Sequence, residues 1–451
     1  MPSPQILLHD FFSDLESMDD GIETNHGLIE VKLRAFVCDA PVRASLKCII
    51  SHSGYSSCER CTQHGEYHNS VVMPRTDCEA RTDETFLLKS HPEHHKGVSP
   101  LEEIGFPMVS CFIIDYMHCC CIGVMKRILL RLQSSHKNHT KKVHFGSQQK
   151  LAFNAYLDKI REKIPSDFSR RLEGGIENIS HWKASEMRLF LLYIGIVIFA
   201  SKEIIPTKIR VNIQYFSTAM RLLLLNGQSK NVKFIEFLMK TFVEDAASLY
   251  GTSFVSYNVH NLIHLHDDYY NFGNLNNISA FPFESFLGTQ IKGIAMGGFK
   301  PLQQISQHVT KLNLEVDQVD VSKSVQAYGH IKECIHDMPG NCFKSLKLRQ
   351  NMTVKVISCL NGRDSAVQTV GGDIGIIHAI HNNNNKNHIL LQLFEKSDLY
   401  TKPLASSKVG VHKLQKLATC KFVTSEEIFG KLIIVPYKKK FIGQVLLHSR
   451  E

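Results

Sequence analysis

The segment CDAPVRASLKCIISHSGYSSCERC, residues 38–61, carries the two features on which the expected fold depends. It starts at the end of an apolar, β-branched run, VKLRAFVCDA (31–40), which predicts a buried strand that Pro41 prevents from continuing. Asp39 therefore lies at the carboxyl end of that strand. The segment ends with CERC (58–61), two cysteines whose spacing lets a tight turn present both thiolates to one metal ion.

A pair of histidines with ligand spacing lies far downstream, in VHNLIHLHDD (259–268). His260 and His264 are four residues apart, so one face of a helix presents both imidazoles to the same ion. Two cysteines and two histidines are a common structural zinc set. The sequence therefore predicts that Zn²⁺ joins two distant segments of the chain through Cys58, Cys61, His260 and His264.

Other interpretations of these motifs stay open. His266 competes with His264 as a ligand, although it lies off the helix face of His260, and His118 in DYMHCC is a further candidate. Without a metal, the cysteines would be a chance pair and the histidines a polar face of a helix. The other His-rich segment, around HPEHH (91–95), predicts a solvated loop.

The composition is that of a globular protein with more than one domain. Of the 451 residues, 43% are hydrophobic and 21% are charged. The formal net charge of +9 fits a polyanionic partner such as nucleic acid without specifying one. The longest apolar stretch, residues 189–200, is too short to span a bilayer, and the 13 cysteines without a secretory signal favour reduced thiols. We therefore expect no membrane association.

Hydrophobic periodicity separates a helical middle from a β-rich end. Residues 230–250 place Ile235, Leu238 and Phe242 on one face of a helix, and similar patterns recur from about 111 to 300. After residue 351, short strand-like runs such as IGIIHAI and KLIIVPY alternate with turn signals such as NGRD and GGD. This pattern predicts a small β domain at the C-terminal end.

Two carboxylates are candidates for a catalytic metal site. Asp39 ends the predicted strand, and Glu284 in AFPFESFLG (280–288) lies early in a predicted helix. Carboxylates at strand ends and on a neighbouring helix suit a pair of Mg²⁺ or Mn²⁺ ions, which prefer hard oxygen ligands. Each residue also has a simpler interpretation: Asp39 caps a helix or turn after the strand, and Glu284 lies on the surface of an amphipathic helix.

The order of these motifs resembles that of the DDE transposases, which are RNase H-like cut-and-paste enzymes, and especially of the CACTA-like group with a zinc-stabilised insertion. The resemblance covers roughly residues 25–305 and includes IDYMHCCCIGVMKRIL, HWKASEMRLFLLYIG, YNVHNLIHL and SAFPFESFLG. It implies that Asp39 is the second acidic residue of the catalytic triad, that Glu284 is the third, and that the cysteines and histidines hold zinc. It also implies transposon-end DNA as a partner, a homo-oligomer and a nuclear location.

One part of the family pattern is missing. The first catalytic Asp of the family lies on the first strand of the sheet, many tens of residues before the second, but only 38 residues precede Asp39. Asp19 and Asp20, in MDDGIETNHG, read as a helix end and turn. We therefore expect an N-terminally truncated, transposon-derived protein that is catalytically inactive, because a two-metal site without one of its three carboxylates holds metal poorly.

The expected fold class is α/β plus α: a partial RNase H-like fold, interrupted by a large all-helical insertion and followed by a small C-terminal β domain. The expected division is a partial RNase H-like region with C-x-x-C at 1–110, the helical insertion ending in H-x-x-x-H at 111–270, a final helix with Glu284 at 271–310, a connector at 311–350 and the β domain at 351–451.

The sequence leaves three functions in competition. The first is the inactive transposase-like protein, kept as a DNA-binding or interaction protein. The second is an active transposase or endonuclease in a longer form, which hydrolyses phosphodiesters with two metal ions and transfers the freed strand. The third is a zinc-stapled helical scaffold that binds protein, which predicts zinc without a Mg²⁺ site and without DNA affinity.

Overall fold

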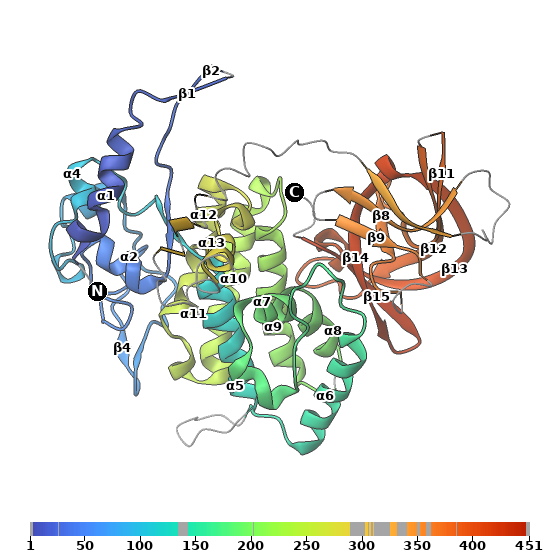
Figure 1. Ribbon diagram of the computed structural model, residues 1–451. Helices are drawn as coiled ribbons and strands as arrows, with labels where there is room; N and C mark the ends of the chain where they lie inside the picture. The colour runs from blue at the N-terminus through green and yellow to red at the C-terminus, as the bar shows by residue number, and fades with distance from the viewer. Residues whose placement is uncertain are drawn as a thin grey trace. The chain divides into compact units, whose positions relative to one another are not determined.

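The computed structural model describes residues 3–25, 27–133, 143–201, 203–288, 303–304, 306–307, 310, 325–331, 341–349, 352–357, 362–384 and 386–447. The chain forms two compact units. The N-terminal unit comprises Met1–His144 and Val211–Ala280, and the C-terminal unit comprises Phe145–Arg210 and Phe281–Glu451. Both helices and strands are present, as the sequence predicts (Figure 1).

The N-terminal unit is organised around a parallel pair of short strands. β3 (Phe36–Cys38) pairs with β6 (Phe112–Ile114), so that Cys38 lies opposite Ile114. Asp39 follows β3 and caps α2 (Ala40–Leu46), because its Oδ1 accepts the backbone N–H of Val42 at 2.9 Å. The strand predicted over 31–40 is longer than the one observed, since pairing with β6 covers only three residues.

The remaining elements of this unit are mostly helical. They are α1 (Pro4–Glu16), β1 (Ile22–Thr24), β2 (Gly27–Ile29), β4 (Glu66–Tyr67), β5 (Val71–Val72), α3 (Asp83–Leu87), η1 (Pro92–His94), α4 (Pro100–Glu103), the π-helix η2 (Met117–Met125), α5 (Lys126–Gln133), α9 (Thr207–Leu223, which begins before the unit boundary), η5 (Ser229–Asn231), α10 (Val232–Tyr250), η6 (Thr252–Phe254), α11 (Tyr257–Asn261), η7 (Leu262–His264), α12 (Leu265–Phe272) and η8 (Leu275–Ile278). In α10 the predicted apolar face is buried, including Ile235, Leu238 and Phe242.

The C-terminal unit contains a six-stranded antiparallel barrel. The strand order is β10 (Ala366–Thr369), β14 (Ile428–Tyr437), β15 (Lys440–Val445), β13 (Val411–Thr424), β12 (Lys386–Asp398) and β11 (Ile374–Asn383). Pairing of β10 with β11 closes the barrel. Apolar side chains such as Val367, Ile377 and Leu391 fill one of its two core clusters. The predicted C-terminal β domain is thereby confirmed.

Three further strands extend the sheet of the barrel. β8 (Asn341–Arg349) pairs with β11, and both β7 (Gln326–Ile331) and β9 (Met352–Lys355) pair with β8. β7 and β8 therefore lie within the span predicted as a connector, of which residues 311–324 fall outside the described residues. Periodicity missed these strands because they lie beside the barrel and bury few apolar side chains; β7 is mostly exposed.

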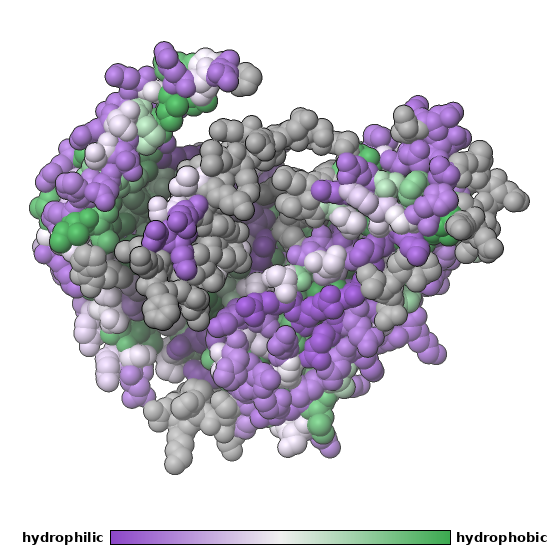
Figure 2. Space-filling view, viewed as in Figure 1, coloured by the Kyte–Doolittle hydropathy of each residue, from purple (hydrophilic) through white to green (hydrophobic). Residues whose placement is uncertain are grey.

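Helices from residues 145–210 pack on the barrel within the same unit. They are α6 (Ser147–Arg161), η3 (Ile176–His181), α7 (Ala184–Leu189), η4 (Phe190–Ile194) and α8 (Gly195–Ile198). The backbone oxygen of Tyr193 accepts a hydrogen bond from Gln444 at 2.7 Å, and its hydroxyl accepts one from the backbone N–H of Leu447 at 2.9 Å. The face of α6 turned to the viewer is largely hydrophilic (Figure 2), which leaves the opposite, apolar face for this packing.

The prediction of reduced thiols holds for most of the described cysteines but not for all of them. Ten cysteines of the described part are free thiols, among them the buried Cys119, Cys120 and Cys121, but Cys342 is disulfide-bonded, against the expectation of reduced thiols. None of the described helices is both long and apolar enough to cross a membrane.

The hairpin of β1 and β2 carries apolar surface (Figure 2), because Ile22, Leu28 and Ile29 are exposed on it.

Candidate metal centre

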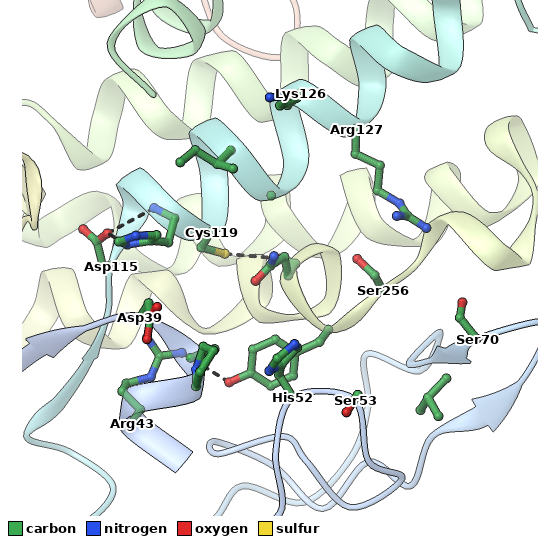
Figure 3. A pocket seen from close by; sticks show the side chains of 18 of the residues that line it. Asp39, Arg43, His52, Ser53, Ser70, Asp115, Cys119, Lys126, Arg127 and Ser256 are labelled. Carbon is green, nitrogen blue, oxygen red and sulfur yellow. Dashed lines mark hydrogen bonds and ion pairs between the residues drawn. The ribbon is translucent and has the colours of Figure 1, made fainter. Parts of the chain in front are cut away.

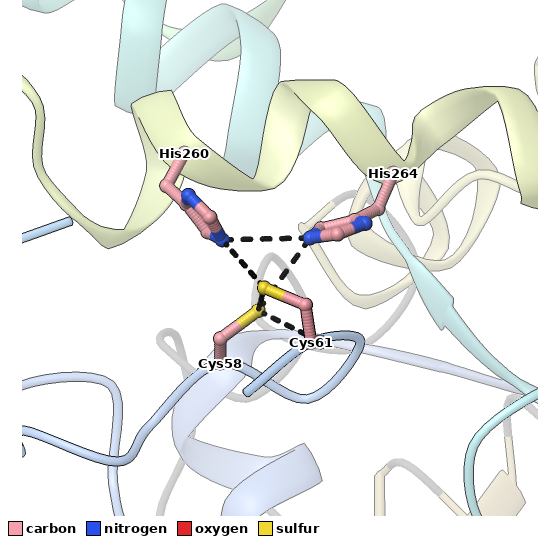
Figure 4. A group of neighbouring side chains, drawn as sticks. All are labelled: Cys58, Cys61, His260 and His264. Atoms are coloured by element: carbon pink, nitrogen blue, oxygen red, sulfur yellow. Dashed lines mark hydrogen bonds between the residues drawn. The ribbon is translucent and has the colours of Figure 1, made fainter. Parts of the chain in front are cut away.

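Four buried side chains converge in the N-terminal unit, as the sequence predicts. Cys58 and Cys61 lie on the loop after α2, His260 lies on α11 and His264 on η7 (Figure 4). The ligand atoms of all four lie within 4.8 Å of one another. The group can therefore hold one metal ion.

The distances between the four ligand atoms fit a tetrahedral zinc site. The two sulfurs are 3.5 Å apart, the two Nε2 atoms 3.4 Å, and the sulfur-to-nitrogen distances are 3.6 Å for Cys58–His264 and 3.2 Å for Cys61–His260. Zinc bonds of about 2.3 Å to sulfur and about 2.1 Å to nitrogen give tetrahedron edges of roughly 3.8, 3.4 and 3.6 Å in that order. Each of these four edges lies within about 0.4 Å of that geometry, and all six edges are at most 4.8 Å.

The loop that carries the cysteines is held by the side chain of Arg81 and by one hydrogen bond within the turn. Arg81 Nε donates to the carbonyl oxygens of Cys58 at 3.1 Å and of Cys61 at 3.0 Å, and the N–H of Cys61 points at the sulfur of Cys58 at 3.4 Å. These contacts fix the turn, so that both sulfurs face the histidines. Burial lowers the pKa of His264, which keeps its imidazole in the neutral form that binds metal.

The two residues between the cysteines are buried charges, which the motif alone did not reveal. Glu59 accepts hydrogen bonds from Arg43 at 2.9 Å, from Lys47 at 2.9 Å and from the hydroxyl of Tyr257 at 2.6 Å. Although burial favours the neutral acid, Arg43 and Lys47 hold the pKa of Glu59 well below its usual range. Glu59 thus ties the cysteine loop to α2 and to α11.

Arg60 makes the corresponding link to the strand pair and to α12. Its NH2 group donates to Asp268 and to the carbonyl oxygen of Phe112 at 2.8 Å, while Asp268 accepts the backbone N–H of Ile114 at 2.9 Å. Arg43 adds contacts to the carbonyl oxygens of Cys38 at 2.9 Å and Ile113 at 3.3 Å. A network of ion pairs therefore joins the metal centre to the ends of both strands.

A second aspartate lies beside Asp39 at the end of the neighbouring strand. Asp115 directly follows β6, and because Cys38 and Ile114 are partners in register, Asp39 and Asp115 continue adjacent parallel strands (Figure 3). The sequence held a signal for it, since FIID (112–115) repeats the pattern of FVCD (36–39). Sequence reasoning missed Asp115 because the preceding apolar run is only three residues long.

The hydrogen-bonding capacity of Asp115 is largely used. Its Oδ1 accepts the N–H of Ala280 at 2.9 Å, and its Oδ2 accepts the backbone N–H of His118 at 3.0 Å and lies 2.7 Å from the Nδ1 of that ring. Although burial alone would raise it, these hydrogen bonds lower the pKa of Asp115. His118, considered above as a zinc ligand, thus pairs with Asp115.

The other candidate residues occupy separate places. Glu284 is exposed on α13 (Phe281–Phe286), which belongs to the C-terminal unit. The Nδ1 of His266 lies 2.8 Å from the carbonyl oxygen of Ile263, away from the four ligands. Asp19 and Asp20 lie in the turn after α1, as predicted. His94 is fully buried, with its Nδ1 2.7 Å from the carbonyl oxygen of Ser56, so the predicted solvated loop is wrong for this residue.

Asp39 and Asp115 line one end of a groove of about 1000 Å³ within the N-terminal unit. One wall is a face of η2 and α5, which carries His118, Lys126, Arg127 and Arg131. The opposite wall comes from residues 52–53 and the hairpin of β4 and β5, and residues 256–258 complete the lining. The groove therefore combines carboxylates at one end with arginines at the other.

Comparison with known proteins finds one matching family model, and it matches only the strand-rich part of the C-terminal unit. Residues 327–446 match a family model described as a domain of unknown function, DUF8592. This span covers β7 to β15, apart from the first residue of β7. No curated protein and no solved structure matches the chain.

Proposed function

We propose that the chain is a zinc-stapled, transposase-derived protein that binds DNA without cutting it. The observation that carries this proposal is the buried Cys₂His₂ group beside a parallel strand pair that ends in Asp39 and Asp115. The transposase resemblance implies such an arrangement of zinc ligands, and it supplies DNA as the partner, the nucleus as the location and self-association as a homo-oligomer.

The metal proposed for the centre is Zn²⁺ with a structural role. Four protein ligands fill a tetrahedral set, and Cys58, Cys61 and His260 are at most 2% exposed, which leaves no open position for a substrate. Zinc would join the loop after α2 to the helix pair α11 and η7. These two segments are distant in the sequence, since Cys61 and His260 are 199 positions apart.

Catalysis by two metal ions has little support in the described residues. Among the described residues, the side chains that lie together as a possible metal site are the two cysteines and two histidines, not a cluster of carboxylates. Asp39 uses one oxygen as a helix cap, and both oxygens of Asp115 accept hydrogen bonds. A third carboxylate beside them is required for the family chemistry, and we therefore propose an inactive site.

Metal analysis together with a plasmid-nicking assay tests this proposal. We expect about one zinc per chain, retarded migration of a DNA fragment, and no Mn²⁺-dependent nicking above that of Asp39→Asn, a variant in which asparagine keeps the helix cap. Asp77→Asn, at an exposed position, serves as the charge-matched control. Nicking by the wild type that Asp39→Asn and Glu284→Gln both abolish would overturn the inactive assignment.

An active nuclease is the second candidate, and one observation favours it. Asp39 and Asp115 extend adjacent parallel strands and line the same groove, which is an arrangement that suits Mg²⁺ or Mn²⁺. This function requires that Asp115→Asn and Asp39→Asn abolish nicking while the zinc content stays unchanged. Zinc binding with neither nicking nor DNA affinity would instead favour the zinc-stapled scaffold for protein partners.

A further inference from the structure

The arginine-rich end of the groove holds two cations side by side over one aromatic ring. The guanidinium carbon of Arg127 lies 5.5 Å from the ring centroid of Phe254, and that of Arg131 lies 6.0 Å from the same centroid. Arg127 donates to the carbonyl oxygens of Phe254 at 3.0 Å and Ser253 at 2.6 Å, and Arg131 donates to the Ser253 hydroxyl at 3.3 Å. The turn before α11 therefore fixes both guanidinium groups.

These two arginines have no acidic partner among the described ion pairs of the chain. Arg131 is only 5% exposed, and its NH1 atom is buried without a hydrogen-bond partner. Burial lowers the pKa of Arg131 to about 10, and the nearby charge of Arg127 acts in the same direction. A buried guanidinium nitrogen that lacks an acceptor is costly, and a phosphate oxygen would supply one.

The basic side chains lie on the helical face of η2 and α5 that begins next to Asp115. Asp115, His118, Ile122, Lys126 and Arg131 all line the groove, and the 16 steps from Asp115 to Arg131 span at most roughly 24 Å along the helix axis. The acidic groups that face this groove are Asp39 and Asp115 at the far end, since Glu59 beneath them is neutralised by Arg43 and Lys47. Charge is thus separated along the groove, with the arginine end positive.

The opposite wall offers an aromatic side chain at the surface. Tyr67 on β4 lines the groove and is 68% exposed, and His52 lies on the neighbouring loop. Grooves that combine cations for the backbone with exposed aromatic rings for the bases are typical of single-stranded nucleic-acid binding. A duplex leaves no unstacked base for such a ring.

We propose that this groove binds a single strand of nucleic acid, with successive phosphates on Arg131 and Arg127 and a base stacked on Tyr67. The strand runs along η2 and α5 toward Asp39 and Asp115. This assignment rests on the proposed function, since it names the form of nucleic acid and the residues that hold it.

Fluorescence anisotropy with a labelled 12-nucleotide oligo(dT) and the zinc-loaded full chain tests the arginines. We expect Arg127→Gln/Arg131→Gln to weaken binding at least tenfold and to make the slope of log K against log salt shallower by about 1.4, because each lost phosphate contact on a single strand removes about 0.7. Arg127→Lys/Arg131→Lys should keep the salt slope of the wild type, because both charges remain, although the affinity falls with the loss of the planar guanidinium contacts. Arg75→Gln, which removes one exposed charge outside the groove, should behave as the wild type does.

The tyrosine test covers the case in which the arginine variants lose zinc and so report on folding. Tyr67→Ala should weaken oligo(dT) binding roughly fivefold or more, as expected for one stacked base. Tyr270→Ala is the matched control, because Tyr270 is 73% exposed and lies outside the groove. Equal binding by the two tyrosine variants would overturn the stacking role.

The remaining outcomes separate the groove from the proposed function. If the wild type binds DNA, and Arg127→Gln/Arg131→Gln binds it with the same affinity and the same salt slope as Arg75→Gln, the groove assignment is wrong and the proposed function stands. Tighter binding of a 12-base-pair duplex than of oligo(dT), or competition by thymidine monophosphate as strong as by oligo(dT), would also overturn it. A wild type that binds no nucleic acid at low salt would remove the proposed function as well.

Discussion

The N-terminal unit and the barrel hold distant parts of the chain together by different interactions. In the N-terminal unit, the two strands β3 and β6 share only three register pairs, and distant segments meet at the four candidate metal ligands, at buried ion pairs and in an apolar cluster that includes Leu8 and Phe112. In the barrel, β12 and β13 alone share ten register pairs, and the clustered core is apolar. A short strand pair forms few ladder hydrogen bonds, so the sheet contributes less to the first unit than to the second.

The contrast between the units predicts different consequences when each kind of interaction is removed. The barrel also contains a buried charge, Lys431, which pairs with Asp364 and Asp167. That exception provides a test of whether buried ion pairs matter equally in both units. At neutral pH, the largest effect is expected from the metal and the smallest from a single buried histidine.

Removal of the metal is expected to affect the N-terminal unit alone. Structural zinc contributes about 10 kcal/mol or more in small domains, so a chelator or His260→Ala should unfold the centre. Hydrogen exchange followed by mass spectrometry should show lost protection in peptides covering 36–61 and 257–272, with protection of 374–394 retained. His266→Ala, which removes a histidine outside the group of four ligands, should keep its zinc. Unchanged exchange in 36–61 after chelation would contradict the stapling role.

Neutralising Glu59 is expected to lower the free energy of unfolding less than loss of the metal does, but more than neutralising a surface carboxylate. Glu59→Gln leaves Arg43 and Lys47 buried without their common counterion, which should lower the free energy of unfolding by about 3–5 kcal/mol. Urea denaturation measures the change, and Glu66→Gln on the exposed strand β4 is the matched control. If the two variants have the same stability, the buried network is not what holds the cysteine loop.

Neutralising Lys431 is the corresponding change in the barrel. Lys431→Met keeps the aliphatic length but leaves Asp167 without its cation and Asp364 with only the more distant Lys355, and we expect the free energy of unfolding to fall by about 3 kcal/mol. Hydrogen exchange should show the loss in β14 and β10, and the zinc content should stay unchanged. Lys438→Met, at the exposed β14–β15 turn, is the control. A fall in zinc content in Lys431→Met but not in the control would contradict the separation of the two mechanisms.

The smallest effect at neutral pH is expected for His94, because its contribution to the free energy of unfolding changes only below about pH 6.5. Burial lowers the pKa of His94 to about 3 from an ordinary value of 6.5. The folded-state pKa is therefore the depressed one, so the contribution of a neutral His94 is complete above pH 6.5 and is lost as the pH falls toward 3, by about 1.4 kcal/mol per pH unit. His94→Gln should flatten the unfolding free energy between about pH 6.5 and about pH 4, measured against His68→Gln at an exposed position. Equal slopes for the two variants would contradict this assignment.

The local spacing of residues made parts of the fold and of the site predictable. The buried face of α10 and the barrel strands after residue 351 follow from apolar periods, because each element buries one side. The four candidate metal ligands were predictable because each pair is set by a turn or a helix, whatever lies between the pairs. The strands β7 and β8 were not, since strands beside the barrel carry few buried residues.

By itself, the sequence determined the identities and the paired spacing of Cys58, Cys61, His260 and His264, and the mixed α and β character of the chain. Only the tertiary structure decided that the four ligand atoms lie within 4.8 Å of one another, that Asp115 lies beside Asp39, and that Arg127 and Arg131 share one wall of a groove. The physical reason is that chelating pairs and amphipathic faces depend on neighbours within one turn. Burial, strand partners and the pairing of charges depend on residues that lie many tens of positions away or more, such as His260 for Cys61 and Asp268 for Ile114.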